Sequence, residues 1–265
     1  MYGFSYRRAT SLEEAVRLLA ETPESKLLAG GQTLIPTLKQ RLAAPECLID
    51  IGRIAELETI RAEGEALVIG ACARHNDVAT HAEVQRLQPA LAELVTHIGD
   101  PHVRNKGTLG GSIANNDPAA DYPAACLALD AKIHTNHRII DAGEFFTGLF
   151  ETALEDNEII THVTFPHPAR AAYMKFPNPA SRYAMAGVFV AQGPDGVRVA
   201  VTGAGADGVF RAHDMEQALT ANWSPEVVAT LTPSPDLMTA DIHGDATYRA
   251  HLITVMAKRA VAATL

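Results

Sequence analysis

The chain has 265 residues, of which 47% are hydrophobic and 20% are charged, and its formal net charge is -9. This length suits one large domain or two modest ones. The negative charge, with no basic cluster, excludes a nucleic-acid surface, and no apolar run approaches the roughly 20 residues of a membrane span. Because the first residues contain no apolar signal core, we expect a cytoplasmic protein.

The cysteines exclude two further classes. Cys47, Cys72 and Cys126 are odd in number and far apart, which argues against a disulfide framework. They are also too few for the four thiolates that an iron–sulfur cluster normally takes. If the chain transfers electrons, an organic cofactor or a partner subunit has to take part.

The first fifty residues predict an α/β unit. A helix is expected over Thr10–Ala20, with Ser11 as its cap and Glu14 completing a capping box. The apolar run Ser25–Ala29 predicts a strand, a second helix follows Thr33, and Cys47–Ile51 predicts another strand. A strand, a loop, a helix and a strand in this order form an α/β unit.

The rest of the chain predicts a mixed, largely antiparallel arrangement. A hairpin is expected around a turn at 62–65, helices over 76–98, and mainly loop over 99–121. Pro166–Arg182 contains four prolines and marks a boundary. The later expected elements are strands and a terminal helix, at Ala131–Thr135, Arg138–Asp141, Glu158–Pro166, Ala186–Gln192, Val197–Thr202 and Ala246–Leu265.

Two glycine motifs carry the functional signal. Ala29–Thr33 reads AGGQT, and Thr108–Asp121 reads TLGGSIANNDPAAD. Glycine lets the backbone approach a ligand closely, and successive bare N–H groups form a concavity that suits phosphate oxygens. Each glycine pair, taken alone, is better explained as an ordinary tight turn. Together they predict one diphosphate held from two sides.

The chemistry of these residues suggests separate roles. Asp117 and Asp121 repel phosphate, so they suit ribose hydroxyls or an adenine amino group, with helix capping as an equally weighted alternative. Arg104 and Lys106 flank the second motif and suit either phosphate or solvent. Hydrogen bonds to the diphosphate are expected from backbone amides and hydroxyls, at Gly30, Gly31, Gln32, Thr33, Thr108, Gly110, Gly111 and Ser112.

Two other patterns are weaker. Gly203, Gly205 and Gly208 match the G-x-G-x-x-G pattern of nicotinamide-binding folds, but the preceding strand is expected in an antiparallel hairpin and no helix opening follows. We therefore interpret them as a glycine turn. His134 and His137 lie three apart on an expected strand, so they face opposite sides and cannot chelate one metal.

Longer stretches around these motifs resemble a known family. They are KLLAGGQTLIPTLKQRLAAPECLIDIGRI, IGDPHVRNKGTLGGSIANNDPAADYPAACLALDA and FPNPASRYAMAGVFVA. They resemble the FAD-binding medium subunit of molybdenum hydroxylases, which includes the carbon monoxide dehydrogenase medium chain and the xanthine dehydrogenase FAD-binding subunit. The resemblance covers nearly the whole chain.

The resemblance implies an α+β fold of the vanillyl-alcohol oxidase and para-cresol methylhydroxylase type. It implies FAD-binding subdomains at 1–57 and 58–168, and a small C-terminal α+β domain of the carbon monoxide dehydrogenase flavoprotein type at 169–265. Asp117 and Asp121 would serve the diphosphate–ribose and adenosine part, Ile159 or Ile160 would pack on the flavin, and Lys175 falls near a family lysine that approaches the flavin. The two diphosphate cradles would be Leu28, Ala29, Gly30, Gly31, Gln32 and Thr33, and Thr108, Gly110, Gly111, Ser112 and Asn115.

The functional hypothesis is an oxidoreductase subunit that holds FAD without a covalent link. It would take electrons from a small iron–sulfur subunit and deliver them to an external acceptor. The iron–sulfur subunit would receive these electrons from a large molybdenum-cofactor subunit. No side chain is assigned as a proton-transfer catalyst, and no metal site is expected. The alternatives are a stand-alone FAD oxidase or reductase and a non-redox nucleotide-binding protein.

Overall fold

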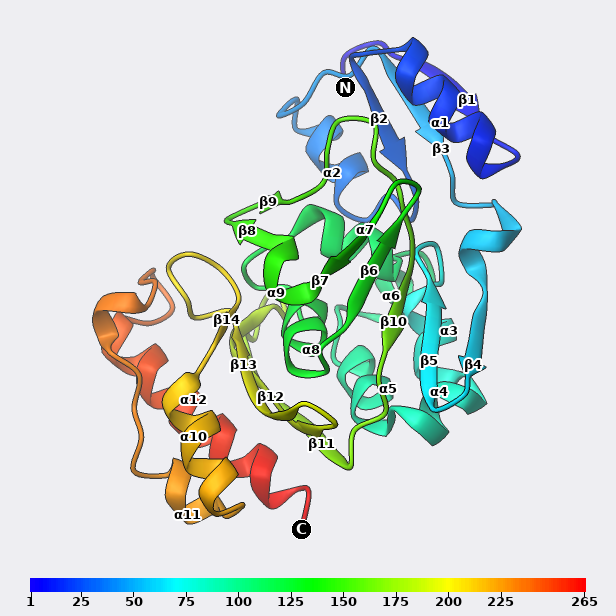
Figure 1. Ribbon diagram of the computed structural model, residues 1–265. Helices are drawn as coiled ribbons and strands as arrows, with labels where there is room; N and C mark the ends of the chain where they lie inside the picture. The colour runs from blue at the N-terminus through cyan, green and yellow to red at the C-terminus, as the bar shows by residue number, and fades with distance from the viewer.

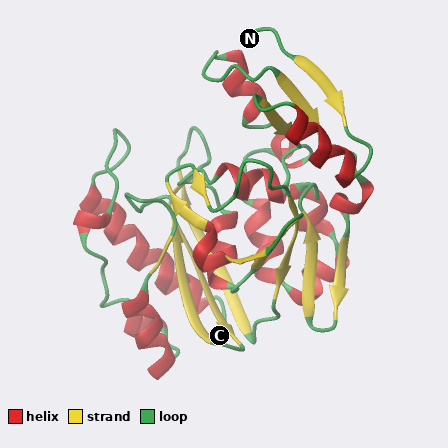
Figure 2. Cartoon of the chain, turned by 45° about the horizontal axis from the view of Figure 1, so that its top comes forward, coloured by secondary structure: helices red, strands yellow, loops and turns green.

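Residues 1–265 are all described by the computed structural model, which contains both helices and mostly antiparallel sheets. The elements gather into three lobes in chain order (Figure 1). The N-terminal lobe stands apart at one end, and the central and C-terminal lobes pack together below it (Figure 2). No helix combines the length and apolar composition needed to cross a bilayer.

The N-terminal lobe is the expected α/β unit. Its three parallel strands have the order β1-β3-β2, with the largely buried β3 in the middle. Ser11 caps the first helix by accepting from the N–H of Glu14, whose carboxylate binds Thr10. The elements are β1 (Ser5–Arg8), α1 (Leu12–Glu21), β2 (Ser25–Leu28), α2 (Leu34–Lys39) and β3 (Cys47–Asp50).

The central lobe is a five-stranded sheet of order β4-β5-β10-β6-β7, and its pairs are antiparallel. Its helices and the sheet enclose the largest apolar core of the chain. The elements are η1 (Ala55–Glu58), β4 (Ile60–Glu63), β5 (Ala66–Gly70), α3 (His75–Thr80), α4 (Ala82–Leu87), α5 (Pro89–Thr96), α6 (Pro101–Arg104), α7 (Leu109–Asn115), α8 (Tyr122–Ala128), β6 (Lys132–Thr135), β7 (Ile139–Asp141), α9 (Ala142–Phe145), β8 (Phe146–Gly148), β9 (Glu151–Thr152) and β10 (Ile160–Phe165).

The C-terminal lobe is a four-stranded antiparallel sheet of order β11-β12-β13-β14 with helices on one side. Successive strand residues face opposite sides, and β12 is buried on both. Phe189 packs into the core of the central lobe, whereas Val188 and Val190 pack with α12. The elements are β11 (Arg170–Pro177), β12 (Ala184–Gly193), β13 (Gly196–Thr202), β14 (Phe210–Arg211), α10 (His213–Ala221), α11 (Pro225–Val228), η2 (Pro235–Leu237) and α12 (Ala246–Ala262).

One sequence expectation is incomplete at the second glycine motif. The stretch 99–121 was expected to be mainly loop, but it contains α6 and the two-turn helix α7, Leu109–Asn115. Thr108 caps α7 by accepting a hydrogen bond from the N–H of Gly111 (3.2 Å). Asn116 ends it in the left-handed conformation, with φ of 42°. These end contacts outweigh the poor helix propensity of two adjacent glycines.

Two further expectations about glycine and histidine can be compared with the structure. The Gly203–Gly208 stretch follows β13, which pairs antiparallel with β12, so it is a turn in an antiparallel sheet. The expectation that His134 and His137 lie on one strand is wrong, because His137 lies between β6 and β7. His134 on β6 instead stacks on His162 of β10, with ring centroids 4.1 Å apart. No group of three or more His, Cys, Asp or Glu side chains has the arrangement of a metal site.

Candidate functional site: a cavity between two glycine motifs

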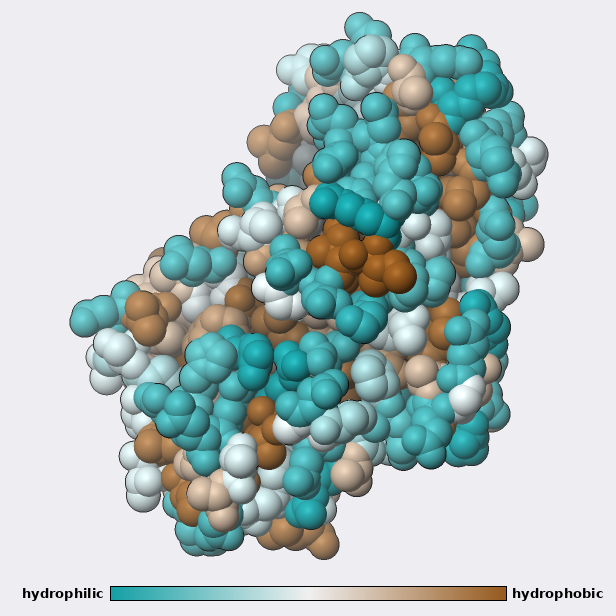
Figure 3. All heavy atoms as spheres, in the orientation of Figure 1, coloured by the Kyte–Doolittle hydropathy of each residue, from teal (hydrophilic) through white to brown (hydrophobic).

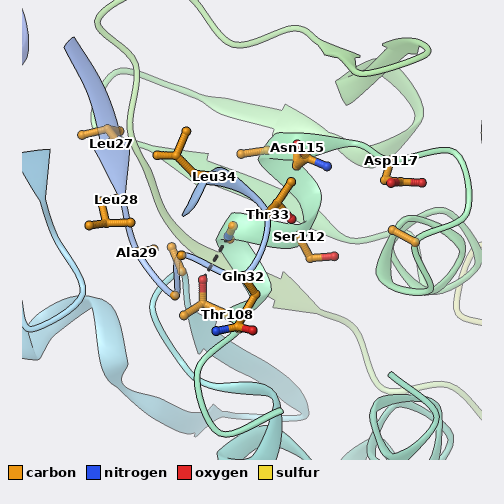
Figure 4. Close-up of a pocket in the computed structure, with 18 of the residues that line it drawn as sticks. Leu27, Leu28, Ala29, Gln32, Thr33, Leu34, Thr108, Ser112, Asn115 and Asp117 are labelled. Carbon is orange, nitrogen blue, oxygen red and sulfur yellow. Dashed lines mark hydrogen bonds between the residues drawn. The ribbon is translucent and has the colours of Figure 1, made fainter. Parts of the chain in front are cut away.

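A cavity of about 730 Å³ opens between the N-terminal and central lobes. Pockets of this size hold small molecules and cofactors. Most of the predicted cofactor residues surround it, and Figure 4 shows several of them gathered from β2, the following loop and α7. The predicted residues in its lining are Leu28, Ala29, Gly30, Gly31, Gln32, Thr33, Thr108, Gly110, Gly111, Ser112, Asn115, Asp117, Asp121, Ile159 and Ile160.

The first glycine motif touches Lys106 and Gly107, the residues that directly precede the second motif. A Cβ atom added to Gly30 would lie 2.1 Å from the carbonyl oxygen of Lys106 and 2.8 Å from Cα of Gly107. A Cβ atom on Gly110 would lie 2.6 Å from Cβ of Ala71. Real Cβ contacts do not come this close, so only glycine lets these backbone segments approach.

The first motif offers the free backbone donors. The N–H groups of Gly30, Gly31 and Gln32 donate to no protein acceptor. In the second motif, the N–H of Gly110 donates to the carbonyl of Ala71 (2.8 Å) and that of Gly111 to Thr108. The expectation that all these amides are available is therefore wrong for the second motif, because the Gly110 amide ties the motif to Ala71 and the Gly111 amide is used in the cap of α7.

The second motif contributes side chains instead. Ser112 and Asn115 lie on α7 and point into the space beside Thr33 (Figure 4). Asp117 accepts from the N–H of Ala119 with one carboxylate oxygen (2.9 Å). Burial raises the pKa of this carboxyl. The arrangement offers hydroxyl, amide and carboxylate groups, which suit a polar ligand with several hydroxyls.

The two aspartates differ in their surroundings. Asp121 is 5% exposed, and its carboxylate accepts from the Tyr173 hydroxyl and from Lys175 Nζ. Burial raises the pKa of Asp121, and Lys175 and Tyr173 oppose that shift. The expected cap is absent, because the Asp121 side chain accepts no hydrogen bond from the first turn of α8.

Lys175 lies outside the lining of the cavity. Its ammonium group binds Asp121 and the carbonyl of His97 (3.0 Å). Its predicted approach to the flavin stays a prediction. Arg104 also lies outside the lining and donates to the carbonyls of Ile98 and Gly99, and Lys106 does not line it either.

The apolar side of the cavity comes from the segment before β10. Ile159 is 1% exposed and packs into the core of the N-terminal lobe, so it joins the two lobes. The preceding Glu158 accepts from Arg138 (2.9 Å) and Thr135 (2.7 Å). The Arg138 guanidinium lowers the pKa of Glu158 to about 2. The fixed Glu158 carboxylate therefore anchors the backbone directly before Ile159 and Ile160.

Several lining residues were missed by the sequence reasoning. Arg182 and Tyr183 reach the cavity from the loop between β11 and β12, and Arg182 has a positive φ of 64°. His75 lines the cavity from the start of α3. The sequence contains no periodicity or motif that singles out these three residues. A charged residue with positive φ beside a cavity is a structural sign of function.

The fold, the cavity and the matches to known proteins define an FAD-binding flavoprotein with the α+β architecture of the vanillyl-alcohol oxidase and para-cresol methylhydroxylase type. Residues 2–168 match the family model described as the FAD binding domain in molybdopterin dehydrogenase. The chain belongs to this family of flavoprotein subunits of oxidoreductases, and the resemblance inferred from the sequence is confirmed.

Similar proteins extend the match over the whole chain. The carbon monoxide dehydrogenase medium chain of Hydrogenophaga pseudoflava is 36% identical, over 97% of this chain and 96% of the relative. The nicotine 6-hydroxylase medium subunit of Paenarthrobacter nicotinovorans is 33% identical, over 97% and 95%. Among solved structures, carbon monoxide dehydrogenase of Hydrogenophaga pseudoflava matches with a TM-score of 0.89, 37% identity and coverage of 99% and 97%. Quinoline 2-oxidoreductase of Pseudomonas putida 86 matches with a TM-score of 0.90, 28% identity and the same coverage.

Proposed function

We propose that the chain is the electron-transfer subunit of a cytoplasmic molybdenum hydroxylase. It takes electrons from the iron–sulfur clusters of a small partner subunit and delivers them to an external acceptor, while a large molybdenum-cofactor subunit acts on the substrate. When bound, FAD supplies the redox chemistry, and the chain supplies binding and electrostatics. The names of the similar proteins support this assembly, because they are medium chains or medium subunits.

One observation carries the proposal for this chain: two glycine motifs from different lobes meet at one cavity. The free amides of Gly30, Gly31 and Gln32 bind the diphosphate, together with hydroxyls of Thr33 and Thr108. Ser112, Asn115 and Asp117 bind the diphosphate–ribose and adenosine part. Ile159 or Ile160 packs on the flavin, and FAD is held without a covalent link.

We also propose the division 1–57, 58–168 and 169–265. Each range contains one main sheet, β1–β3, β4–β10 and β11–β14 in turn. The first two ranges line the cavity together, and the third adds Ser181, Arg182 and Tyr183.

The experiment compares the chain alone with the assembled complex. The purified chain should bind about one FAD and show no turnover of carbon monoxide, an aldehyde or xanthine with a dye acceptor. Coexpression with the large and small subunits of its gene neighbourhood should give a complex containing molybdenum, iron and flavin. Removal of FAD from this complex should abolish reduction of the external acceptor while substrate still bleaches the iron–sulfur absorbance.

Each part of the result has a definite meaning. Turnover by the isolated, FAD-loaded chain would show a stand-alone flavin oxidase or reductase and overturn the subunit proposal. A chain that stays colourless with added FAD, alone and in the complex, would overturn the cofactor assignment.

A further inference from the structure

The imidazole of His75 packs against Gly107, the residue that directly precedes the second glycine motif. His75 is the first residue of α3, it is 4% exposed, and it lines the cavity. The backbone N–H of His75 donates to the carbonyl of Gly107 (2.9 Å), and the neighbouring Arg74 forms an antiparallel bridge with Thr108. The backbone before α3 is therefore bonded directly to the start of the motif.

Neither ring nitrogen of His75 has a hydrogen-bond partner in the chain, and Nε2, unlike Nδ1, is not fully buried, so Nε2 is the nitrogen left for a ligand in the cavity. Nδ1 of His75 is buried and has no hydrogen-bond partner. Most buried polar side-chain atoms in proteins are hydrogen-bonded, so an exception calls for an explanation. The ring packs against Tyr122, with centroids 5.4 Å apart, and the Tyr122 hydroxyl is also buried without a partner. These two packed rings thus carry two buried polar atoms without a hydrogen-bond partner.

The ring also supports the contact between the two motifs. A Cβ atom on Gly107 would lie 2.5 Å from Nε2 of His75, and one on Gly30 would lie 2.8 Å from Cα of Gly107. Gly30, Gly107 and His75 are therefore packed in series from the first motif to the floor of the cavity. A smaller side chain at position 75 would let Gly107 sink away from Gly30.

We propose that His75 is a cofactor-positioning residue, which holds Gly107 against the first motif and donates a hydrogen bond from Nε2–H to the diphosphate of FAD. This inference rests on the proposed FAD site. Burial, with the positive charge of Arg104, lowers the pKa of His75 to about 4. The ring is therefore neutral at pH 7, with one N–H donor and one acceptor nitrogen.

The test uses the full-length chain freed of FAD. His75→Leu keeps an apolar side chain of similar size and removes the donor, whereas His75→Gln keeps a donor. Affinities for FAD and for ADP are measured by calorimetry, and apo-protein stability by thermal unfolding. Loss of one hydrogen bond to a charged oxygen is expected to weaken both ligands about tenfold in His75→Leu and less than about threefold in His75→Gln.

The apo-protein melting temperature of His75→Leu is expected to stay at or above that of the wild type, since the variant removes a buried polar atom that has no partner. His102→Gln, an exposed histidine of α6 near the cavity, is the matched control and should bind both ligands normally. Wild-type affinity in His75→Leu would overturn the proposal. A loss for FAD without a loss for ADP would overturn the diphosphate contact. A wild-type chain that binds no FAD would instead refute the proposed function.

Discussion

Lys175 Nζ lies 2.9 Å from Oδ2 of Asp121, and the two side chains are 2% and 5% exposed. Lys175 is on β11 of the C-terminal lobe, and Asp121 directly precedes α8 of the central lobe. This buried ion pair therefore joins the second glycine motif to the third sheet. Asp121 lines the cavity but its carboxylate is already bound, so its expected role toward the sugar competes with a structural role.

Lys175→Met should destabilise the protein strongly. Removing one partner of a buried ion pair leaves the other charge unpaired, which typically costs about 3–5 kcal/mol. The free energy of unfolding in urea measures the effect. The double variant Lys175→Met with Asp121→Asn should recover part of the loss, because no buried charge is left alone.

Lys132→Met is the control for this pair. Lys132 and Asp141 form an exposed ion pair with side-chain exposures of 53% and 57%. Exposed pairs contribute little, so the free energy of unfolding should hardly change. Equal losses at positions 132 and 175 would contradict a special role for the buried pair.

Gly30→Ala should weaken FAD binding strongly while the chain still folds. The added methyl group would meet the Lys106 carbonyl at 2.1 Å, so the motifs have to separate. We expect a loss of at least about 100-fold in FAD affinity, since losing two hydrogen bonds from free amides to charged oxygens costs about 3 kcal/mol or more. Quenching of flavin fluorescence measures it.

Gly143→Ala is the matched glycine variant. Gly143 lies in α9, and nothing lies within 4 Å of an added Cβ atom. It should bind FAD like the wild type and be slightly more stable, because alanine favours a helix. If Gly30→Ala also bound FAD normally, the two motifs would not form the clasp.

The sequence predicted the parts of the fold that depend on local patterns. The parallel pair Ser25–Leu28 and Cys47–Asp50 follows from two apolar runs around a helix. Helix α7 was missed, since its stability comes from the Thr108 cap and from Gly110 packing on Ala71. Such contacts depend on tertiary structure, which overrides helix propensity.

The site was predicted in the same uneven way. The glycine motifs were recognised because glycine next to glycine and hydroxyl residues has a direct chemical meaning. The Asp121–Lys175 pair joins residues far apart in the chain, and no spacing rule connects them. The same holds for Tyr183, which reaches the cavity from the loop between two antiparallel strands of another lobe.

The stability of the wild type should fall more steeply than that of His75→Leu as the pH falls from 6.5 to 4. The pKa of His75 is lowered from 6.5 to about 4 in the folded chain. Between these values the unfolded chain binds the proton and the folded chain does not, so acid favours unfolding. His75 therefore lowers the free energy of unfolding of the wild type by about 3 kcal/mol below pH 4, and has no such effect above pH 7.

Unfolding in urea at several pH values compares the two proteins. The pKa of His162 is also lowered to about 4, but His162 is present in both proteins and cancels in the difference. Parallel stability curves for the wild type and His75→Leu would contradict the buried, neutral state of His75.

Thr202→Val tests how the C-terminal lobe supports the second motif. Thr202 is fully buried at the end of β13, and its hydroxyl lies 2.6 Å from the carbonyl of Ala120 and 3.1 Å from that of Pro118. Valine has the same shape but no donor, so both carbonyls lose this partner. The expected loss is about 1–3 kcal/mol in the free energy of unfolding. Because Ala120 lines the cavity, FAD affinity should also fall several-fold.

Thr230→Val is the control for this variant. The Thr230 hydroxyl is exposed and bonds only the local carbonyl of Val227, so neither the free energy of unfolding nor the FAD affinity should change. Loss of stability with normal FAD affinity would show that the C-terminal lobe supports the fold without shaping the cofactor site.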